Sequence, residues 1–156
     1  MSIYDEESLL FDIETIMKNN LNTKITEINN EKNDSIVLAQ VDSSAYLMDM
    51  DDRHVNYNPA VIYNISNMET ESLGPITSRN IIINIGLIVN DNGDADIVKR
   101  MLRYGRALRE IFEANFNFAG VIGKFKISSL PVLSFQLKNT SQRYKIVGLD
   151  LETTIA

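Results

Sequence analysis

The sequence contains no cysteine, a single histidine and no long apolar run among its 156 residues. The absence of cysteine excludes disulfide bonds, thiolate metal sites and cysteine nucleophiles, and it suits assembly in a reducing cytoplasm. No apolar stretch approaches the roughly 20 residues that a membrane-spanning helix needs. Met1–Glu7 lacks the basic region and apolar run of a signal peptide, so we expect none. The composition therefore predicts no membrane partner.

Acidic residues outnumber basic ones by 21 to 15, which gives a formal net charge of −6. This balance argues against nonspecific binding to a nucleic-acid backbone, and we expect no specific nucleic-acid binding either. Hydrophobic residues make up 44% of the chain and charged residues 23%, as in an ordinary globular protein. A chain of this length fits one domain with a real core, which we place at residues 1–156.

One segment, Asn80–Phe116, predicts most of the fold. A nearly continuous apolar strand, Asn80–Val89, leads through an Asp-Asn-Gly turn into a two-faced helix from about Ala95 to Ala114. Alternate strand residues from Ile81 to Val89 share one face, as in a central strand packed against helices. Gly105 lies on the apolar side of the helix and would permit close approach to the sheet.

The other elements follow from periodicity and turn residues. A helix is expected at Glu6–Leu21 with Asp5 as N-cap, and Ser66–Ser78 is expected to form a long loop or an extended hairpin tip. Polar residues predict a loop at Asn29–Asp34 and a hairpin turn at Asn139–Gln142. The expected strands are Ser35–Val41, Ala45–Met48, Ala60–Ile65, Gly123–Ser128, Val132–Lys138 and Arg143–Glu152. The predicted fold is α+β, a mainly antiparallel sheet packed by an N-terminal helix and a central amphipathic helix in the order α-β-β-β-α-β-β.

No residue cluster predicts ordinary catalysis, cofactor binding or a metal site. His54 lies near Asp51 and Asp52, but a solvated loop histidine explains the pattern better than a general base. The acidic stretch Asp49–Asp52 lacks the spacing of a calcium loop. Gly120–Lys124 lacks the full phosphate-loop pattern, and a strand rather than a helix is expected to follow it. We therefore expect no enzyme; a small hydrolase or nucleotide-binding domain using His54 and Asp49–Asp52 is the alternative.

The outer face of the central helix is rich in arginine. Arg106 and Glu110, and Arg109 and Glu113, have the i, i+4 spacing of ion pairs. On an acidic protein, this face is interpreted first as a solvated, salt-bridged surface and second as a surface for a partner. The charged residues of this face, including those at its edges, are Lys99, Arg100, Arg103, Arg106, Arg109, Glu110 and Glu113.

The order of these elements resembles the phage tail terminator, or tail-completion, family, which also serves related contractile tail-like particles. The resemblance rests on the N-terminal helix with Leu9, Leu10, Ile13, Ile16 and Met17, the long interruption at Ser66–Ser78, the Ile-rich strand, the Asp-Asn-Gly turn, the helix Ala95–Ala114 and a terminal hairpin ending near Thr154. It covers nearly the whole chain, in architecture and length more than in motif.

The resemblance implies a structural virion protein of the tail–neck region, assembled in the bacterial host cytoplasm. It implies a hexameric ring that caps the tail tube, ends its elongation and offers a face for joining the head. The implied partners are the tail tube protein and, in some particles, sheath and head-completion proteins. It implies no catalytic residues. Alternatives are a head–tail connector or other tail component, and a monomeric adaptor that binds a peptide at its sheet edge. The expected interaction residues are Met68, Glu69, Thr70, Glu71, Leu73, Arg79, Arg100, Arg103, Arg106, Asn139 and Gln142.

Overall fold

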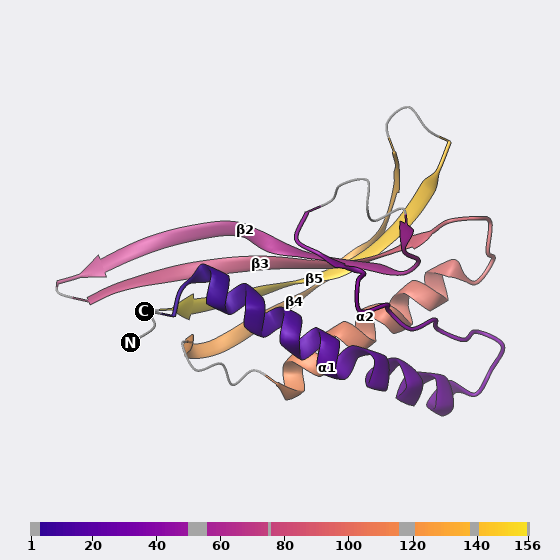
Figure 1. Ribbon diagram of the computed structural model, residues 1–156, viewed down its shortest axis with the longest axis horizontal. Helices are drawn as coiled ribbons and strands as arrows, with labels where there is room; N and C mark the ends of the chain where they lie inside the picture. The colour runs from indigo at the N-terminus through magenta and orange to yellow at the C-terminus, as the bar shows by residue number, and fades with distance from the viewer. Residues whose placement is uncertain (1–3, 50–55, 75, 116–120, 138–140, 156) are drawn as a thin grey trace.

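The computed structural model of the chain describes residues 4–49, 56–74, 76–115, 121–137 and 141–155. Two helices and a five-stranded sheet follow one another in the predicted order (Figure 1), which confirms the α+β fold class. The strands lie in the order β1-β2-β3-β5-β4, with β1 parallel to β2 and all other neighbours antiparallel. The elements are α1 (Glu6–Lys32), β1 (Tyr46–Leu47), β2 (Ala60–Leu73), β3 (Ile76–Asn90), α2 (Ile97–Ala114), β4 (Val121–Gln136) and β5 (Arg143–Ile155).

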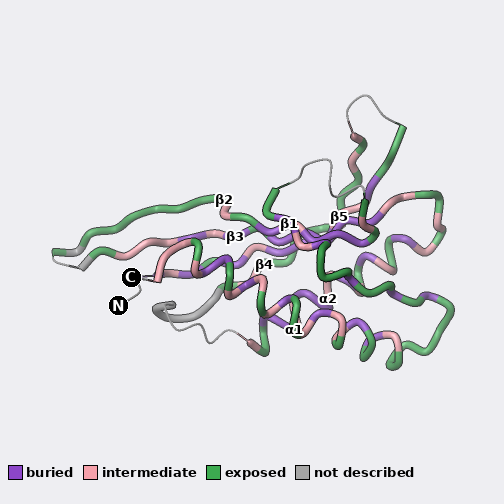
Figure 2. Tube along the Cα trace, viewed as in Figure 1, coloured by how far each residue is buried: buried purple, intermediate pink, exposed green. Residues whose placement is uncertain are grey.

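The core lies between one face of the sheet and the two helices. Ile81, Ile83 and Ile85 of β3 are at most 1% exposed and belong to the same buried cluster as the inward residues of both helices. Figure 2 shows this burial concentrated in the central strands and along the inner sides of the helices. The predicted two-faced character of β3 is therefore confirmed, and Asn84 on its other face is exposed.

The first helix is longer than predicted. Asp5 is the N-cap as expected, since its carboxylate accepts a hydrogen bond from the Ser8 backbone N–H at 2.9 Å. The predicted end at Leu21 is wrong, because the helix continues to Lys32, and of the loop predicted at Asn29–Asp34 only Asn33 and Asp34 lie outside the helix. Ile25 and Ile28 extend the buried stripe by two turns, and this apolar burial outweighs the weak helix preference of the asparagines around them.

The segment 36–41 forms no strand, so the prediction at Ser35–Val41 is wrong. Its backbone is bound by side chains of α1 instead. The Asn22 amide donates to the Val41 carbonyl at 2.9 Å and accepts from the Val41 N–H at 2.8 Å. Asn29 makes the same two bonds with Leu38, at 3.0 and 2.8 Å. These bonds satisfy backbone groups that would otherwise need a neighbouring strand.

The helix α2 binds the same segment from its other side. Arg103 Nη1 donates to the Ile36 carbonyl at 2.8 Å, and the Tyr104 hydroxyl donates to the Ala39 carbonyl at 2.8 Å. Arg100 donates to the Val37 carbonyl between them. We call residues 36–41 the strap, because this extended segment is bound by side chains of both helices.

Three strand predictions need correction. The predicted strand Ala45–Met48 reduces to Tyr46–Leu47, which pairs with Val61 and Ile62. Of the two alternatives for Ser66–Ser78, the extended hairpin tip is confirmed rather than the long loop, because β2 and β3 pair as far as Leu73 and Ile76. The two strands predicted at Gly123–Ser128 and Val132–Lys138 are one strand, β4, in which a register shift between Leu130 and Leu133 accommodates Pro131.

Candidate interaction surfaces

Most of the residues considered for catalysis lie outside the part of the chain that the structure describes. His54, Asp51 and Asp52 lie outside the described residues. Among the residues that are described, no three His, Cys, Asp or Glu side chains are placed to hold a metal ion. The strand β4 begins at Val121, so Val121–Lys124 of the phosphate-loop pattern lie within a strand, and the strand rather than a helix continues after them, as predicted.

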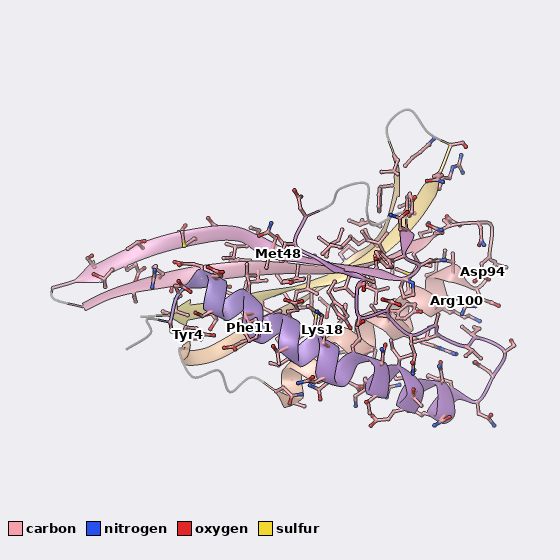
Figure 3. The ribbon with its side chains drawn as sticks, viewed as in Figure 1. Tyr4, Phe11, Lys18, Met48, Asp94 and Arg100 are labelled. Carbon is pink, nitrogen blue, oxygen red and sulfur yellow. The ribbon has the colours of Figure 1, made fainter. Side chains whose placement is uncertain are left out.

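The arginines of α2 bind residues of their own chain. Arg103 forms a bidentate ion pair with Asp34, with N–O distances of 2.9 and 2.5 Å. Arg100 pairs with Asp94 at 3.1 Å, and Figure 3 shows the two side chains together at the start of α2. The structure thus assigns Arg100 and Arg103 an internal role at the strap.

Arg106 lies between two carboxylates, Glu31 at 2.6 Å and Glu110 at 3.1 Å. The hydrogen bond to Glu31, and to a lesser extent the one to Glu110, raises the pKa of Arg106. The guanidinium of Arg106 therefore stays charged. The predicted i, i+4 pairs are confirmed, with Arg109 and Glu113 3.4 Å apart.

Among the charged groups of this face, the Asp34 carboxylate has the most strongly shifted pKa. The hydrogen bonds from Arg103 lower its pKa from 3.8 to about 2, against a smaller opposing effect of desolvation. The same contacts raise the pKa of Arg103. Both groups are therefore ionised at neutral pH, and their pair joins α2 to the residues that follow α1.

The tip of the β2–β3 hairpin carries most of the other predicted interaction residues. Met68, Glu69, Thr70 and Glu71 are exposed, and β2 ends at Leu73. Because directly opposed residues share a face, Glu69 and Glu71 lie on the face of the sheet opposite the helices. Figure 1 shows this hairpin reaching well past both helices.

Two other predicted residues lie near the two ends of β5. Arg79, the partner of Ile155, binds Glu6 of α1 at 2.8 Å and so joins the base of the hairpin tip to the first helix. Gln142 is exposed, accepts a hydrogen bond from the Tyr144 hydroxyl at 2.7 Å and precedes β5. Asn139 lies outside the described residues.

A hollow on the helix-free face of the sheet was missed by the sequence reasoning. It has a volume of about 240 Å³, and Gly86 and Gly148 lie opposite each other at its floor. A Cβ on Gly86 would lie 2.7 Å from Ile146 Cδ1, and one on Gly148 would overlap the Ile85 carbonyl oxygen. The signal was present, since an isolated glycine inside a strand often marks close approach. We call this the open-face hollow; it is lined by Ile62, Asn64, Asn84, Ile85, Gly86, Leu130, Pro131, Leu133, Ile146 and Gly148.

The side chains around the open-face hollow divide it into an apolar and an acidic side. Leu130 and Leu133, 37% and 55% exposed, stand on the apolar side. On the other side, Asn84 donates a hydrogen bond to the Asp150 carboxylate, and Glu152 follows on the same face of β5, 3.9 Å from Lys126 of β4. Glu69 and Glu71 extend this acidic side along β2, so a partner of this face meets an apolar hollow and then carboxylates.

Comparisons with known proteins do not assign the chain to a family. The sequence matches no protein-family model, and no curated protein matches it. Neither α1 nor α2 is long and apolar enough to cross a membrane.

Proposed function

We propose that this protein is a structural component of a phage tail or a related contractile tail-like particle. It forms a ring, six copies being the number that the family resemblance implies, on the last ring of the tail tube. The ring ends tube elongation and offers a face to the head-completion proteins of the neck and, in contractile tails, to the sheath. The order of the helices and strands, on which the resemblance was based, supports this proposal.

The observation that carries the proposal is the projecting β2–β3 hairpin. Its last three residue pairs, from Glu71 and Ser78 to Leu73 and Ile76, lie beyond the last pairing of β3 with β5 at Arg79. At about 3.3 Å per residue they extend roughly 10 Å past the four-stranded part of the sheet. Exposed hairpins that contribute little to their own core commonly contact other molecules. A ring subunit can use such an arm to contact the tube or a neighbouring subunit.

A monomeric adaptor is the second candidate, favoured by the outer edge of β4. This strand lies at the end of the sheet, so one side of its backbone is available for strand addition by a peptide. Pro131 and the register shift beside it interrupt that edge. An edge interrupted in this way supports a short contact better than a long added strand, and we rank the adaptor below the ring.

Shortening the hairpin tests the proposal. Replacing Glu71–Ser78 by Asn-Gly joins the paired residues Thr70 and Arg79 through a two-residue turn. It retains the ion pair between Arg79 and Glu6. We expect a folded protein that caps purified tail tubes about tenfold less efficiently, because a contact at the centre of an interface carries much of its energy. Capping is measured as tube length by negative-stain electron microscopy.

A control variant replaces only Gly74–Pro75 by Asn-Gly and keeps the hairpin at full length. It should cap tubes as the wild type does. Normal capping by the shortened variant would refute the role of the hairpin. Co-assembly with head-completion proteins but not with tail tubes would favour the head–tail connector instead.

A further inference from the structure

Neither α1 nor α2 covers the open-face hollow, because both helices pack on the opposite face of the sheet (Figure 1). Leu133 is 55% exposed at its rim, and the lining is predominantly apolar. Carboxylates of Asp150, Glu152 and Glu69 continue from it along the same face, with Lys126 of β4 3.9 Å from Glu152. An exposed apolar hollow with an acidic border is suited to an apolar surface that has basic residues beside it.

The outer surface of α2 has this composition. Val98 and Leu102, one helical turn apart, are 50% and 59% exposed. Leu102 lies in a shallow groove of about 420 Å³ that is otherwise lined by basic residues, namely Lys32, Lys99, Arg103 and Arg106. The two arginines are held by carboxylates of their own chain. In the described part of the chain, Lys32 and Lys99 form no ion pair.

We propose that the open-face hollow of one copy receives the outer surface of α2 from a second copy. Leu102 enters the apolar hollow, and Lys32 and Lys99 approach the carboxylates at its border. A second copy fits the hollow because the chain itself carries both complementary surfaces. Each surface combines an apolar area with charges opposite to those of the other. The contact itself is argued from the two surfaces alone. Its repetition around a ring rests on the proposed function.

The positions of the two surfaces determine the kind of assembly. The open-face hollow lies on one side of the sheet, whereas α2 packs against the other side. The contact joins two different surfaces, so a pair of copies held by one such contact leaves one hollow and one α2 surface available. Further copies add in the same way, and they form a closed ring when the rotation between neighbouring copies permits it.

Disulfide trapping tests the contact directly, since the chain has no cysteine of its own. The variant Leu102→Cys/Leu130→Cys places one thiol on each surface, at side chains that are 59% and 37% exposed. We expect mild oxidation at the highest soluble concentration to give a ladder of covalent oligomers on a non-reducing gel. The control Thr15→Cys/Leu130→Cys, with an exposed thiol on α1 instead, should give at least about tenfold less of the ladder.

A charge reversal provides an independent measurement. Lys32→Glu/Lys99→Glu, added to the trapping variant, should lower the yield of the ladder about tenfold at low salt, because it replaces attraction by repulsion. Leu133→Lys, which places a charge at the rim of the hollow without any thiol, should weaken self-association about tenfold by light scattering. Circular dichroism of each variant confirms that it is folded.

Two results would overturn the contact while leaving the proposed function intact. One is efficient tube capping by the wild type with a ladder no stronger than that of the control. The other is a Leu133→Lys variant that assembles as the wild type does. Conversely, a clear ladder from a protein that fails to cap tubes would support the contact and refute the proposed function.

Discussion

Asn22 and Asn29 are seven residues apart on α1, and each binds both backbone groups of one strap residue. Seven helical residues rise about 10 Å, and three extended residues span about the same length. Asn29 therefore faces Leu38 while Asn22 faces Val41. A primary amide suits this role because it carries a donor and an acceptor side by side.

The Asn29→Ala variant should be less stable by about 1–3 kcal/mol, because the partly buried N–H and carbonyl of Leu38 lose their partners. The midpoint of urea unfolding measures this loss. Asn30→Ala is the matched control, since the neighbouring Asn30 is exposed. Equal midpoints for the two variants would show that the amide bonds to the strap contribute nothing to stability.

Single residues were predicted well where their role is local. The Asp5 cap depends on Ser8 only three residues away, and Gly105 was expected to allow close approach. A Cβ at Gly105 would lie 2.9 Å from Val147 Cγ2. The roles of Asn22 and Asn29 depend on a segment that lies 9 to 19 residues away in sequence, and asparagine by itself indicates a weak helix. The asparagines therefore suggested the end of the helix, whereas Asn22 and Asn29 in fact bind the backbone of the strap.

At the level of elements, ion pairs link α2 to α1 and to Asp34, which precedes the strap. Arg106 joins Glu31 at the end of α1 to Glu110 on α2, and Arg103 joins α2 to Asp34. The pairing of β2 with β3 and the burial of α2 were predictable, since their periodicity is strong and their partners are near in sequence. The strap was not predictable, because its alternating apolar residues favour an extended segment without showing what binds its backbone. The partner could be a neighbouring strand or, as here, a row of side chains.

The pair between Arg103 and Asp34 predicts a pH dependence. The pKa of Asp34 is about 2 in the folded protein and 3.8 ordinarily. Since the folded value is the lower one, the stabilisation is fully present above about pH 4 and is lost as the pH falls towards about 2. The free energy of unfolding should fall more steeply over this range for the wild type than for Asp34→Asn. Urea titrations at several pH values measure both slopes, and parallel curves would contradict the prediction.

At the level of the whole molecule, a protein of net charge −6 gathers four basic side chains around one groove and carboxylates on its open sheet face. The two-layer architecture was predictable from the amphipathic elements. The candidate surfaces were only partly predictable, since the hairpin tip was indicated by its polarity but the open-face hollow depends on which strands are neighbours. Gly86 and Gly148 meet only because β3 pairs with β5.

Purified protein should form rings with sixfold symmetry, seen by light scattering together with negative-stain imaging of the same sample. Raising the salt concentration from about 0.05 to 0.5 M should weaken this association, because exposed charge pairs are screened. A protein that is monomeric at every concentration and stays so when tail tube is added would contradict the ring. That result would favour the adaptor.

The spacing of the two strap-binding asparagines limits how the sequence can change over evolution. Inserting or deleting one residue between Asn22 and Asn29 rotates one of them by about 100° and shifts it by about 1.5 Å, which separates it from its strap partner. Substituting an exposed residue between them, such as Thr23, leaves the spacing unchanged. The length of this stretch is therefore more constrained than its composition, and related chains should align across it without gaps.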